Sequence, residues 1–184
     1  MIEADEMYQN AGEKGKPHLN LLDPPRRRAN KQRGHGTFDN DRPPIAGLVG
    51  RQSGQLRLRV LKHSDRRELE PFVVGKSVRW VTVNTDEWKA YDQLPVTGRA
   101  HKTVNHTPGQ REWARDEDGD GIREVHCNTL EGIWTGLRNF LRPFRGVSKH
   151  FLSAYVAVFE WTYNLKELTA GLIQTMVLRT LKAT

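Results

Sequence analysis

The sequence predicts an α/β fold, in which a mixed β-sheet is flanked by helices. Its 184 residues are enough for one domain with a substantial core. Segments with strand-like composition occupy the first half of the chain, and stretches with an apolar residue at every third or fourth position occur near its end. Strands and helices in this mixture form one domain when the helices pack on the faces of a single sheet.

Five segments have the composition or the alternation of β-strands. The clearest alternation follows the turn RQSG, where Leu56, Leu58 and Val60 alternate with Arg57 and Arg59. We expect an antiparallel hairpin there, with one buried and one basic face. The predicted strands are residues 1–8, 44–51, 55–61, 77–86 and 101–106.

Helical periodicity is strongest in the stretch NTLEGIWTGLRNFLRPFRG, residues 128–146, with a kink expected at Pro143. A shorter helix is expected after Ser64, a good N-cap, with an interruption at Pro71 or Gly75. Further helical segments are predicted at residues 86–94, 148–163 and 164–184. The apolar stripe of residues 128–146 consists of Leu130, Ile133, Trp134, Leu137, Leu141 and Phe144.

The order of these elements is three antiparallel strands, a crossover helix, a parallel strand and later helices. This is the order of the ribonuclease H-like fold, a mixed sheet flanked by helices. We expect this domain to span residues 1–163 and a helical tail to span residues 164–184. Residues 9–44 are predicted to form a long mobile loop, whose segment 9–35 holds seven basic residues and two acids.

The charge of the chain indicates a polyanionic partner. It has 29 Lys and Arg against 22 Asp and Glu, a net charge of +7, so nucleic acid is the natural candidate. Cys127 is the only cysteine, which excludes an internal disulfide and a cysteine-based zinc site within the chain and suits a reducing cytosol. No apolar run has the roughly 18 residues of a membrane span, and the N-terminus has no signal pattern, so we expect a soluble, intracellular protein without membrane contact.

Three acids lie at positions where a sheet of this kind gathers a site. Asp5 is on the first strand, Asp86 ends the strand after the crossover helix, and Glu131 is in the first turns of a later helix. Ligands of α/β sheets bind at the carboxyl ends of strands. Three converging carboxylates repel one another unless a cation intervenes, and their hard oxygens suit Mg²⁺ or Mn²⁺ in a two-metal site for phosphodiester chemistry.

The chain resembles the catalytic domain of DDE-type insertion-sequence transposases of the ISXO-like, integrase-related class. The matching motifs are IEADEMY, NTDEWKAYDQL, HKTVNH and the segment 125–164. The resemblance implies that Asp5, Asp86 and Glu131 are the catalytic, metal-binding triad. It also implies metal-dependent cleavage at the element's ends, joining of 3′ hydroxyls to target DNA, a homo-oligomer on DNA, and a place near the nucleoid in a bacterial or archaeal cytoplasm.

The chain departs from the family pattern at three points. QNAGEK replaces the usual glycine-rich turn after the first acid, and Arg138 stands where lysine is more usual. Relatives also carry an N-terminal region with zinc-binding cysteines and a helix-turn-helix, whereas only four residues precede Asp5. An alternative is therefore a truncated, non-catalytic remnant that binds DNA through its basic surface. A basic nucleic-acid-binding module without nuclease ancestry is a third possibility.

Basic residues near the three acids are predicted to bind DNA. Glu131 and Arg138 are seven residues apart, which puts them on one face of a helix, two turns apart. Arginines behind a metal-binding acid suit a phosphate backbone that passes over the helix. The predicted DNA-contacting residues are Arg138, Arg142, Arg145, Lys149, Lys89, Arg26, Arg27, Arg28, His106 and Asn128.

Each acid also has a structural interpretation. Glu3 shares a strand face with Asp5 and is its main rival as a ligand, whereas Glu6 is on the opposite face. Asp86 could cap the helical turn that follows it. Glu131 could form a capping box with Asn128.

Other residues have two open interpretations. The segment DEDGDG, residues 116–121, has aspartates at the first, third and fifth positions of a calcium loop, but Cys127 stands where such loops have glutamate, and a solvated acidic loop is the alternative. His106 and His126 are either ordinary hydrogen-bonding residues or contacts of a scissile phosphate. Trp88 and Tyr91 are expected in the core, although Tyr91 could border a DNA groove.

Overall fold

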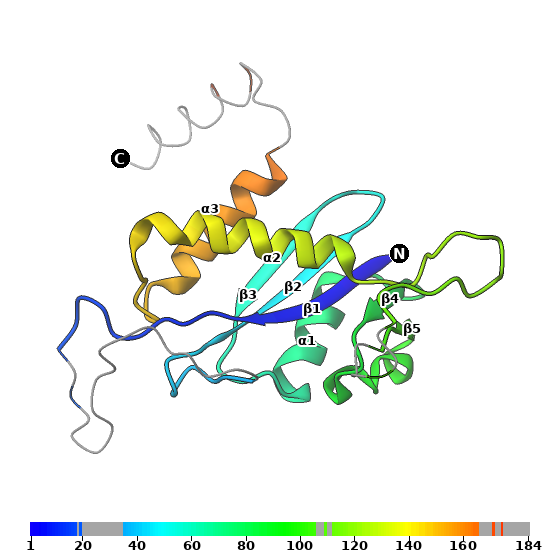
Figure 1. Ribbon diagram of the computed structural model, residues 1–184, viewed down its shortest axis with the longest axis horizontal. Coiled ribbons are helices and arrows are strands. Elements are labelled where there is room, and N and C mark those ends of the chain that lie inside the picture. Colours follow the sequence, from blue (N-terminus) through cyan, green and yellow to red (C-terminus); the bar gives the residue numbers. More distant parts are fainter. Residues whose placement is uncertain are drawn as a thin grey trace.

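A single five-stranded sheet organises the molecule (Figure 1). The computed structural model describes residues 1–17, 19, 35–105, 109, 112–165, 171 and 174. The strands lie in the order β3-β2-β1-β4-β5. In chain order they are β1 (Ile2–Tyr8), β2 (Pro44–Gly50), β3 (Leu56–Val60), β4 (Thr82–Thr85) and β5 (Ala100–Thr103).

The strand directions give the sheet its mixed character. β1 pairs antiparallel with β2 and β2 antiparallel with β3, whereas β1 pairs parallel with β4 and β4 parallel with β5. A helix, α1, connects β3 to β4 and so supplies the crossover that the parallel pairing of β4 requires. This topology confirms the predicted fold class, a ribonuclease H-like mixed sheet flanked by helices.

Helices cover both faces of the sheet: α1 lies on one, and α2 and α3 lie on the other (Figure 1). Short 3-10 turns connect β4 to β5 and end α2. No helix in the described part of the chain is long and apolar enough to cross a bilayer. The helical elements are α1 (Arg66–Lys76), η1 (Lys89–Tyr91), η2 (Leu94–Thr97), α2 (Asn128–Leu141), η3 (Arg142–Phe144) and α3 (Leu152–Asn164).

Strand β1 separates the two cores by its alternation. Ile2 and Ala4 pack in the cluster with α1, and Met7 packs in the cluster with α2 and α3. Odd-numbered residues of β1 therefore face α2, and even-numbered residues face the side of α1. This confirms the predicted split, with Glu3 and Asp5 on one face and Glu6 on the other.

Helix α1 differs from its prediction at its start and in its middle. Its N-cap is Asp65, whose side chain accepts a hydrogen bond from the backbone N–H of Glu68, and not Ser64. Pro71 lies inside the helix without ending it. The missing N–H removes one hydrogen bond, but the helix is held by burial of Leu69, Phe72 and Val73 against the sheet.

Two further boundaries were predicted too early. β4 begins at Thr82 and not at residue 77, because Trp80 has a φ of 66° and a side chain that is 84% exposed, which takes it out of the strand. α3 begins at Leu152 and not at residue 148, because Ser148 starts a turn in which its carbonyl accepts from Phe151.

The long segment between β1 and β2 is tied together at its base. Gln9 donates its backbone N–H to Pro43 and Ala11 donates to Asp41, at 3.1 and 3.0 Å. The Lys149 ammonium lies 3.0 Å from the Asp41 carboxylate, so the base is also fixed to the start of the α3 region. The centre of the predicted loop, with Arg26, Arg27 and Arg28, lies outside the described residues, as does most of the predicted tail.

Candidate active site

Asp5 contacts α2 through the indole of Trp134. Trp134 Nε1 donates to Asp5 Oδ2 at 2.7 Å. Gly47, the β2 partner of Asp5, makes this contact possible, since a Cβ there would lie 2.4 Å from Trp134 Cη2. The sheet therefore has a gap at Gly47 that holds the Trp134 ring and orients the Asp5 carboxylate.

The charges that act on Asp5 indicate that the three predicted acids lie near one another. Burial, together with the nearby charges of Asp86 and Glu131, raises the pKa of Asp5 to about 7, against the opposing effect of the Trp134 hydrogen bond. The structure thus gathers carboxylates from β1, from the end of β4 and from α2. Whether they bind metal stays a prediction.

Asp86 follows β4 directly and is half-buried. Its Oδ1 accepts the backbone N–H of Trp88 at 3.0 Å, but the N-cap of η1 is Trp88 and no side chain caps that turn, so the capping role that the sequence suggested for Asp86 is not formed. Its charge raises the pKa values of Asp5 and Glu6, so the Asp86 carboxylate lies close enough to interact with both acids.

Glu6 is a fourth carboxylate that sequence reasoning left outside the site. Tyr91 donates its hydroxyl to Glu6 Oε2 at 2.8 Å, and Tyr91 is buried as predicted. Burial, and then the charges of Asp5 and Asp86, raise the pKa of Glu6 to about 8. Strand alternation placed Glu6 on the face opposite Asp5. It could not predict that Glu6 also lies close enough to Asp86 to interact with its charge.

A hollow of about 420 Å³ opens between the end of β1 and α2. Glu131 and Arg138 both line it, which confirms that they share a helix face, and both are exposed. Acidic and basic side chains thus face the same space. Its lining residues are Asp5, Glu6, Met7, Tyr8, Arg42, Glu131, Trp134, Thr135 and Arg138.

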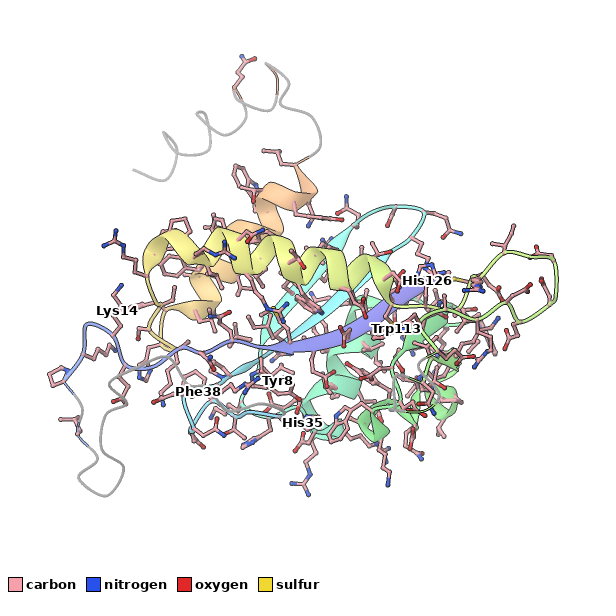
Figure 2. The ribbon with its side chains drawn as sticks, in the orientation of Figure 1. Tyr8, Lys14, His35, Phe38, Trp113 and His126 are labelled. Atoms are coloured by element: carbon pink, nitrogen blue, oxygen red, sulfur yellow. The ribbon has the colours of Figure 1, made fainter. Side chains whose placement is uncertain are left out.

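Tyr8 borders this hollow and is held from two sides. Its hydroxyl donates to Ser64 Oγ at 2.8 Å and contacts His35 Nδ1, which lies beside it (Figure 2). His35 in turn stacks on Trp88, with ring centroids 4.3 Å apart. Burial raises the pKa of Tyr8, so the hydroxyl stays protonated near neutral pH.

Glu3, the rival of Asp5, has its oxygens occupied by donors. Its buried carboxylate accepts the backbone N–H groups of Thr129 and Leu130 at 3.0 and 3.2 Å, and the Thr129 hydroxyl at 2.7 Å. Arg51 Nε lies 2.7 Å from Glu3 Oε1. Glu3 is therefore the anion at the positive end of α2.

The structure does not contain the capping box between Asn128 and Glu131 that was the alternative interpretation of Glu131. The N-cap residue is Cys127, whose side chain makes no capping hydrogen bond, and Asn128 is the first helical residue. Because Glu3 of β1 accepts the free N–H groups of the helix, a local cap is unnecessary. Sequence reasoning looked for the cap nearby, but the carboxylate comes from a residue far away in the sequence.

Two further titratable groups, His126 and Cys127, lie at the start of α2. His126 Nδ1 lies 3.3 Å from Glu3 Oε1, and burial lowers the pKa of His126. Burial also raises the pKa of the Cys127 thiol, which keeps it protonated. His106 lies outside the described residues.

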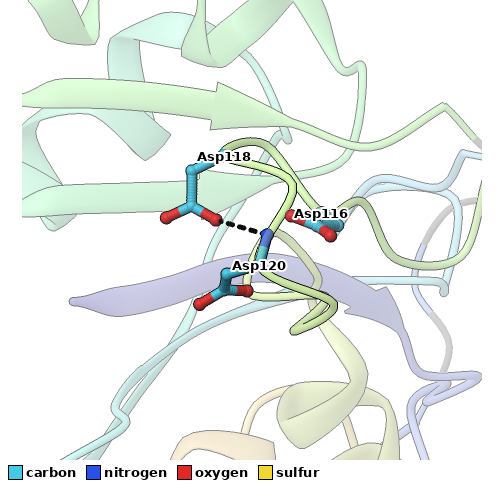
Figure 3. A group of neighbouring side chains, drawn as sticks. All are labelled: Asp116, Asp118 and Asp120. Carbon is cyan, nitrogen blue, oxygen red and sulfur yellow. Dashed lines mark hydrogen bonds between the residues drawn. The ribbon is translucent and has the colours of Figure 1, made fainter.

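The acidic loop stands apart from this hollow. Asp116, Asp118 and Asp120 each offer an oxygen within 4.8 Å of the others, and in the described part of the chain no other three acids, cysteines or histidines lie as close (Figure 3). Asp116 accepts the backbone N–H groups of Gly119 and Gly121, which lowers its pKa. The calcium interpretation stays untested.

The other predicted DNA contacts in the described part of the chain do not line this hollow. Arg142, Lys89 and Asn128 are exposed. Arg145 is exposed in a turn after α2, with a φ of 50°, so it does not continue the helix face of Arg138. Lys149 is half-buried in its ion pair with Asp41.

The sequence of this chain is similar to transposase sequences. The family model described as the ISXO2-like transposase domain matches residues 1–164. The chain is 31% identical over 160 residues to an uncharacterized protein in the transposable element ISH50 of Halobacterium salinarum, a match that covers 86% of this chain and 50% of that protein. An uncharacterized transposase-like protein of Haemophilus influenzae is 26% identical over 86 residues, which are 47% of this chain and 62% of that protein.

Solved structures with a similar chain trace include integrase cores. The catalytic core domain of BIV integrase is 9% identical with a TM-score of 0.48, covering 99% of this chain and 98% of that one. The catalytic core domain of HTLV-2 integrase, solved in complex with magnesium, is 12% identical with a TM-score of 0.46, covering 92% and 90%. The fold assignment rests on the sheet topology and does not depend on these similarities.

The strand order and the crossover helix define a ribonuclease H-like domain. Within that class, the chain belongs to the ISXO2-like transposase domain family, whose model matches most of its length. The chain spans 50% and 62% of the lengths of the two curated relatives.

Proposed function

We propose that this domain carries out metal-dependent DNA strand cleavage and strand transfer for an insertion sequence. The observation that carries the proposal is the gathering of Asp5, Asp86 and Glu131 from three elements, with Asp5 buried enough to raise its pKa to about 7. Membership of a transposase family supports the same reaction class.

The donor set fits Mg²⁺ or Mn²⁺, because carboxylate oxygens are the ligands these ions prefer and the three acids repel one another. Asp5, Asp86 and Glu131 would hold the ions. The three do not share the close spacing of the acidic loop, so their side chains must rotate inward to coordinate together. Bound ions of this kind activate an attacking oxygen and stabilise a leaving oxygen in phosphodiester displacement.

The chain's own residues orient the reactants. Trp134 fixes one Asp5 oxygen, which limits the directions in which the carboxylate can turn. We propose that Arg138, which lines the hollow together with Glu131, contacts a DNA phosphate. We propose water and then a DNA 3′ hydroxyl as nucleophiles, with the element's ends and target DNA as substrates and an oligomer of this chain as the assembly on DNA.

The test is a strand cleavage and joining assay on DNA that carries the element's terminal repeats. Glu131→Gln should abolish cleavage and joining in Mg²⁺ or Mn²⁺ while the protein stays folded, because it removes a charge and leaves the helix face in place. The control is Glu70→Gln on α1, which loses only a surface pair with Arg66 and should keep full activity.

Two outcomes would overturn the proposal. In the first, Glu131→Gln retains metal-dependent cleavage. In the second, the wild-type chain binds DNA equally with and without Mg²⁺ and never cuts it, which is the behaviour of a non-catalytic DNA-binding remnant.

A further inference from the structure

Arg42 lies at the edge of the hollow and has no assigned role. It is in the segment that leads into β2, and it lines the hollow together with Asp5, Glu131 and Arg138. Its guanidinium carbon lies 5.7 Å from the centroid of the Tyr8 ring, which gives the head group a flat apolar support.

The head group of Arg42 is not satisfied by the protein. Its Nε and Nη1 atoms are buried and have no hydrogen-bond partner. A buried cationic N–H without a protein acceptor is costly, and in folded proteins such groups are satisfied by an ordered water or by a ligand that supplies the acceptor. The acids of the same hollow do not fill this role for Nε and Nη1.

The stem of Arg42 is nevertheless fixed. Its backbone N–H donates to the Thr37 carbonyl at 3.0 Å. Gly36 packs directly against it, since a Cβ on Gly36 would lie 2.4 Å from the Arg42 carbonyl oxygen and 2.5 Å from its Cγ. An arginine with a fixed stem and unpaired donors is preorganised for an anion.

The surroundings indicate which anion this is. Arg42 comes from the β1–β2 segment and Arg138 from α2, so two guanidinium groups approach one hollow from different elements. The carboxylates of the hollow would repel a free anion. A DNA phosphodiester could bind beside them when a divalent ion offsets this repulsion, and its oxygens would then accept hydrogen bonds from the Arg42 guanidinium. Guanidinium groups bind such oxygens in a fork.

We propose that Arg42 contacts a backbone phosphate of the DNA strand that lies in this hollow, across from Arg138. The assignment deepens the proposed function and rests on it for the nature of the ligand. Arg42 was absent from the predicted DNA contacts because no periodic pattern includes it.

DNA affinity measures this contact apart from catalysis. The probe is a short fluorescein-labelled DNA duplex, titrated with the full chain in EDTA and in Mg²⁺, from about 50 to about 200 mM salt. Arg42→Gln should weaken binding by about tenfold or more, and should reduce the slope of log K against log salt by about 0.9. The matched control is Arg59→Gln, which removes an exposed arginine on β3 away from the hollow and should change both values little.

Arg42→Lys separates the contact from a packing role. It keeps the charge and most of the stem, so the melting temperature and the salt slope should stay near wild type, while loss of the fork lowers affinity several-fold. Wild-type affinity in Arg42→Lys contradicts the fork contact, even where Arg42→Gln fails to fold.

The two proposals fail in different ways. If Arg42→Gln and Arg59→Gln bind DNA with the same affinity and the chain still cuts DNA, the role of Arg42 is overturned and the proposed function is not. Arg42-dependent binding by a wild-type chain that never cuts DNA overturns the proposed function and leaves the phosphate contact standing.

Discussion

Glu3 and Asp5 are two acids on the same face of β1, two residues apart, and both meet α2. The carboxylate of Glu3 is buried and accepts from Arg51, from Thr129 twice and from Leu130. Asp5 accepts one side-chain hydrogen bond, from Trp134, and lies near two other acids. The two carboxylates therefore have opposite environments on the same strand.

The difference separates a structural acid from an acid that is available for chemistry. The donors around Glu3 stabilise its charge and fix the start of α2 against the sheet. Burial destabilises the charge of Asp5, to which the described residues supply no ion pair, so the carboxylate favours binding a cation or a proton. One strand thus positions the helix at Glu3 and carries the proposed metal ligand at Asp5.

The largest expected effect on stability comes from removing the carboxylate of Glu3. Glu3→Ala should lower the free energy of unfolding by about 3–5 kcal/mol, because it leaves Arg51 partly buried without its partner and removes the anion from the start of α2. Urea denaturation followed by circular dichroism measures the change. Glu70→Gln is the control and should cost less than about 1 kcal/mol. Equal losses in the two variants would show that Glu3 is no more structural than a surface acid.

The pH dependence of stability tests the environment of the Asp5 carboxylate. Its folded pKa of about 7 exceeds the ordinary value of 3.8, so the folded state holds a proton that the unfolded state releases. Asp5 therefore lowers the stability of the protein as pH rises from about 4 to about 7, by about 1.4 kcal/mol per unit of pKa shift. Glu6 acts in the same direction up to about pH 8.

Asp5→Asn should remove its part of this slope. In EDTA, the variant should be more stable than wild type by more than about 1 kcal/mol at pH 8 and should match it near pH 4, since Asn keeps an acceptor for Trp134. Thermal unfolding across this pH range makes the comparison. Parallel curves for the two proteins would mean that the Asp5 carboxylate ionises normally.

A smaller effect is expected from the gap beneath Trp134. Gly47→Ala should cost about 1–3 kcal/mol and displace the indole from Asp5, because the new Cβ meets the ring at 2.4 Å. Gly132→Ala in α2 is the matched control; nothing lies within 4 Å of its Cβ, so it should stabilise the helix by about 0.5–1 kcal/mol. Tryptophan fluorescence and denaturation report both changes. An unchanged free energy of unfolding in Gly47→Ala would contradict the close packing of Trp134 against Gly47.

The sequence predicted best what depends on periodicity. Alternation in β1 separated Glu3 and Asp5 from Glu6, and the spacing in α2 put Glu131 and Arg138 on one face, because each of these inferences needs only the geometry of one element. The apolar stripe likewise predicted the buried face of α2 from Leu130 to Leu141.

What depends on contacts between distant elements was not predictable. Glu3 caps a helix that begins more than a hundred residues later, and Gly47 admits a ring from the same helix. Asn128 was named as a cap because only local donors and acceptors can be read from a sequence. Arg42 likewise shows its unpaired atoms only once the hollow is formed.

The central claim is that Asp5, with Asp86 and Glu131, holds a divalent cation, and Mn²⁺ binding tests it without DNA. A ligand that binds only the folded state stabilises it, by about 2.7 kcal/mol at a hundredfold excess over Kd. Mn²⁺ should raise the melting temperature of wild type and of a variant with Asp116, Asp118 and Asp120 all changed to Asn, but not that of Asp5→Asn. A rise that persists in Asp5→Asn and disappears when the acidic loop is changed would contradict the account.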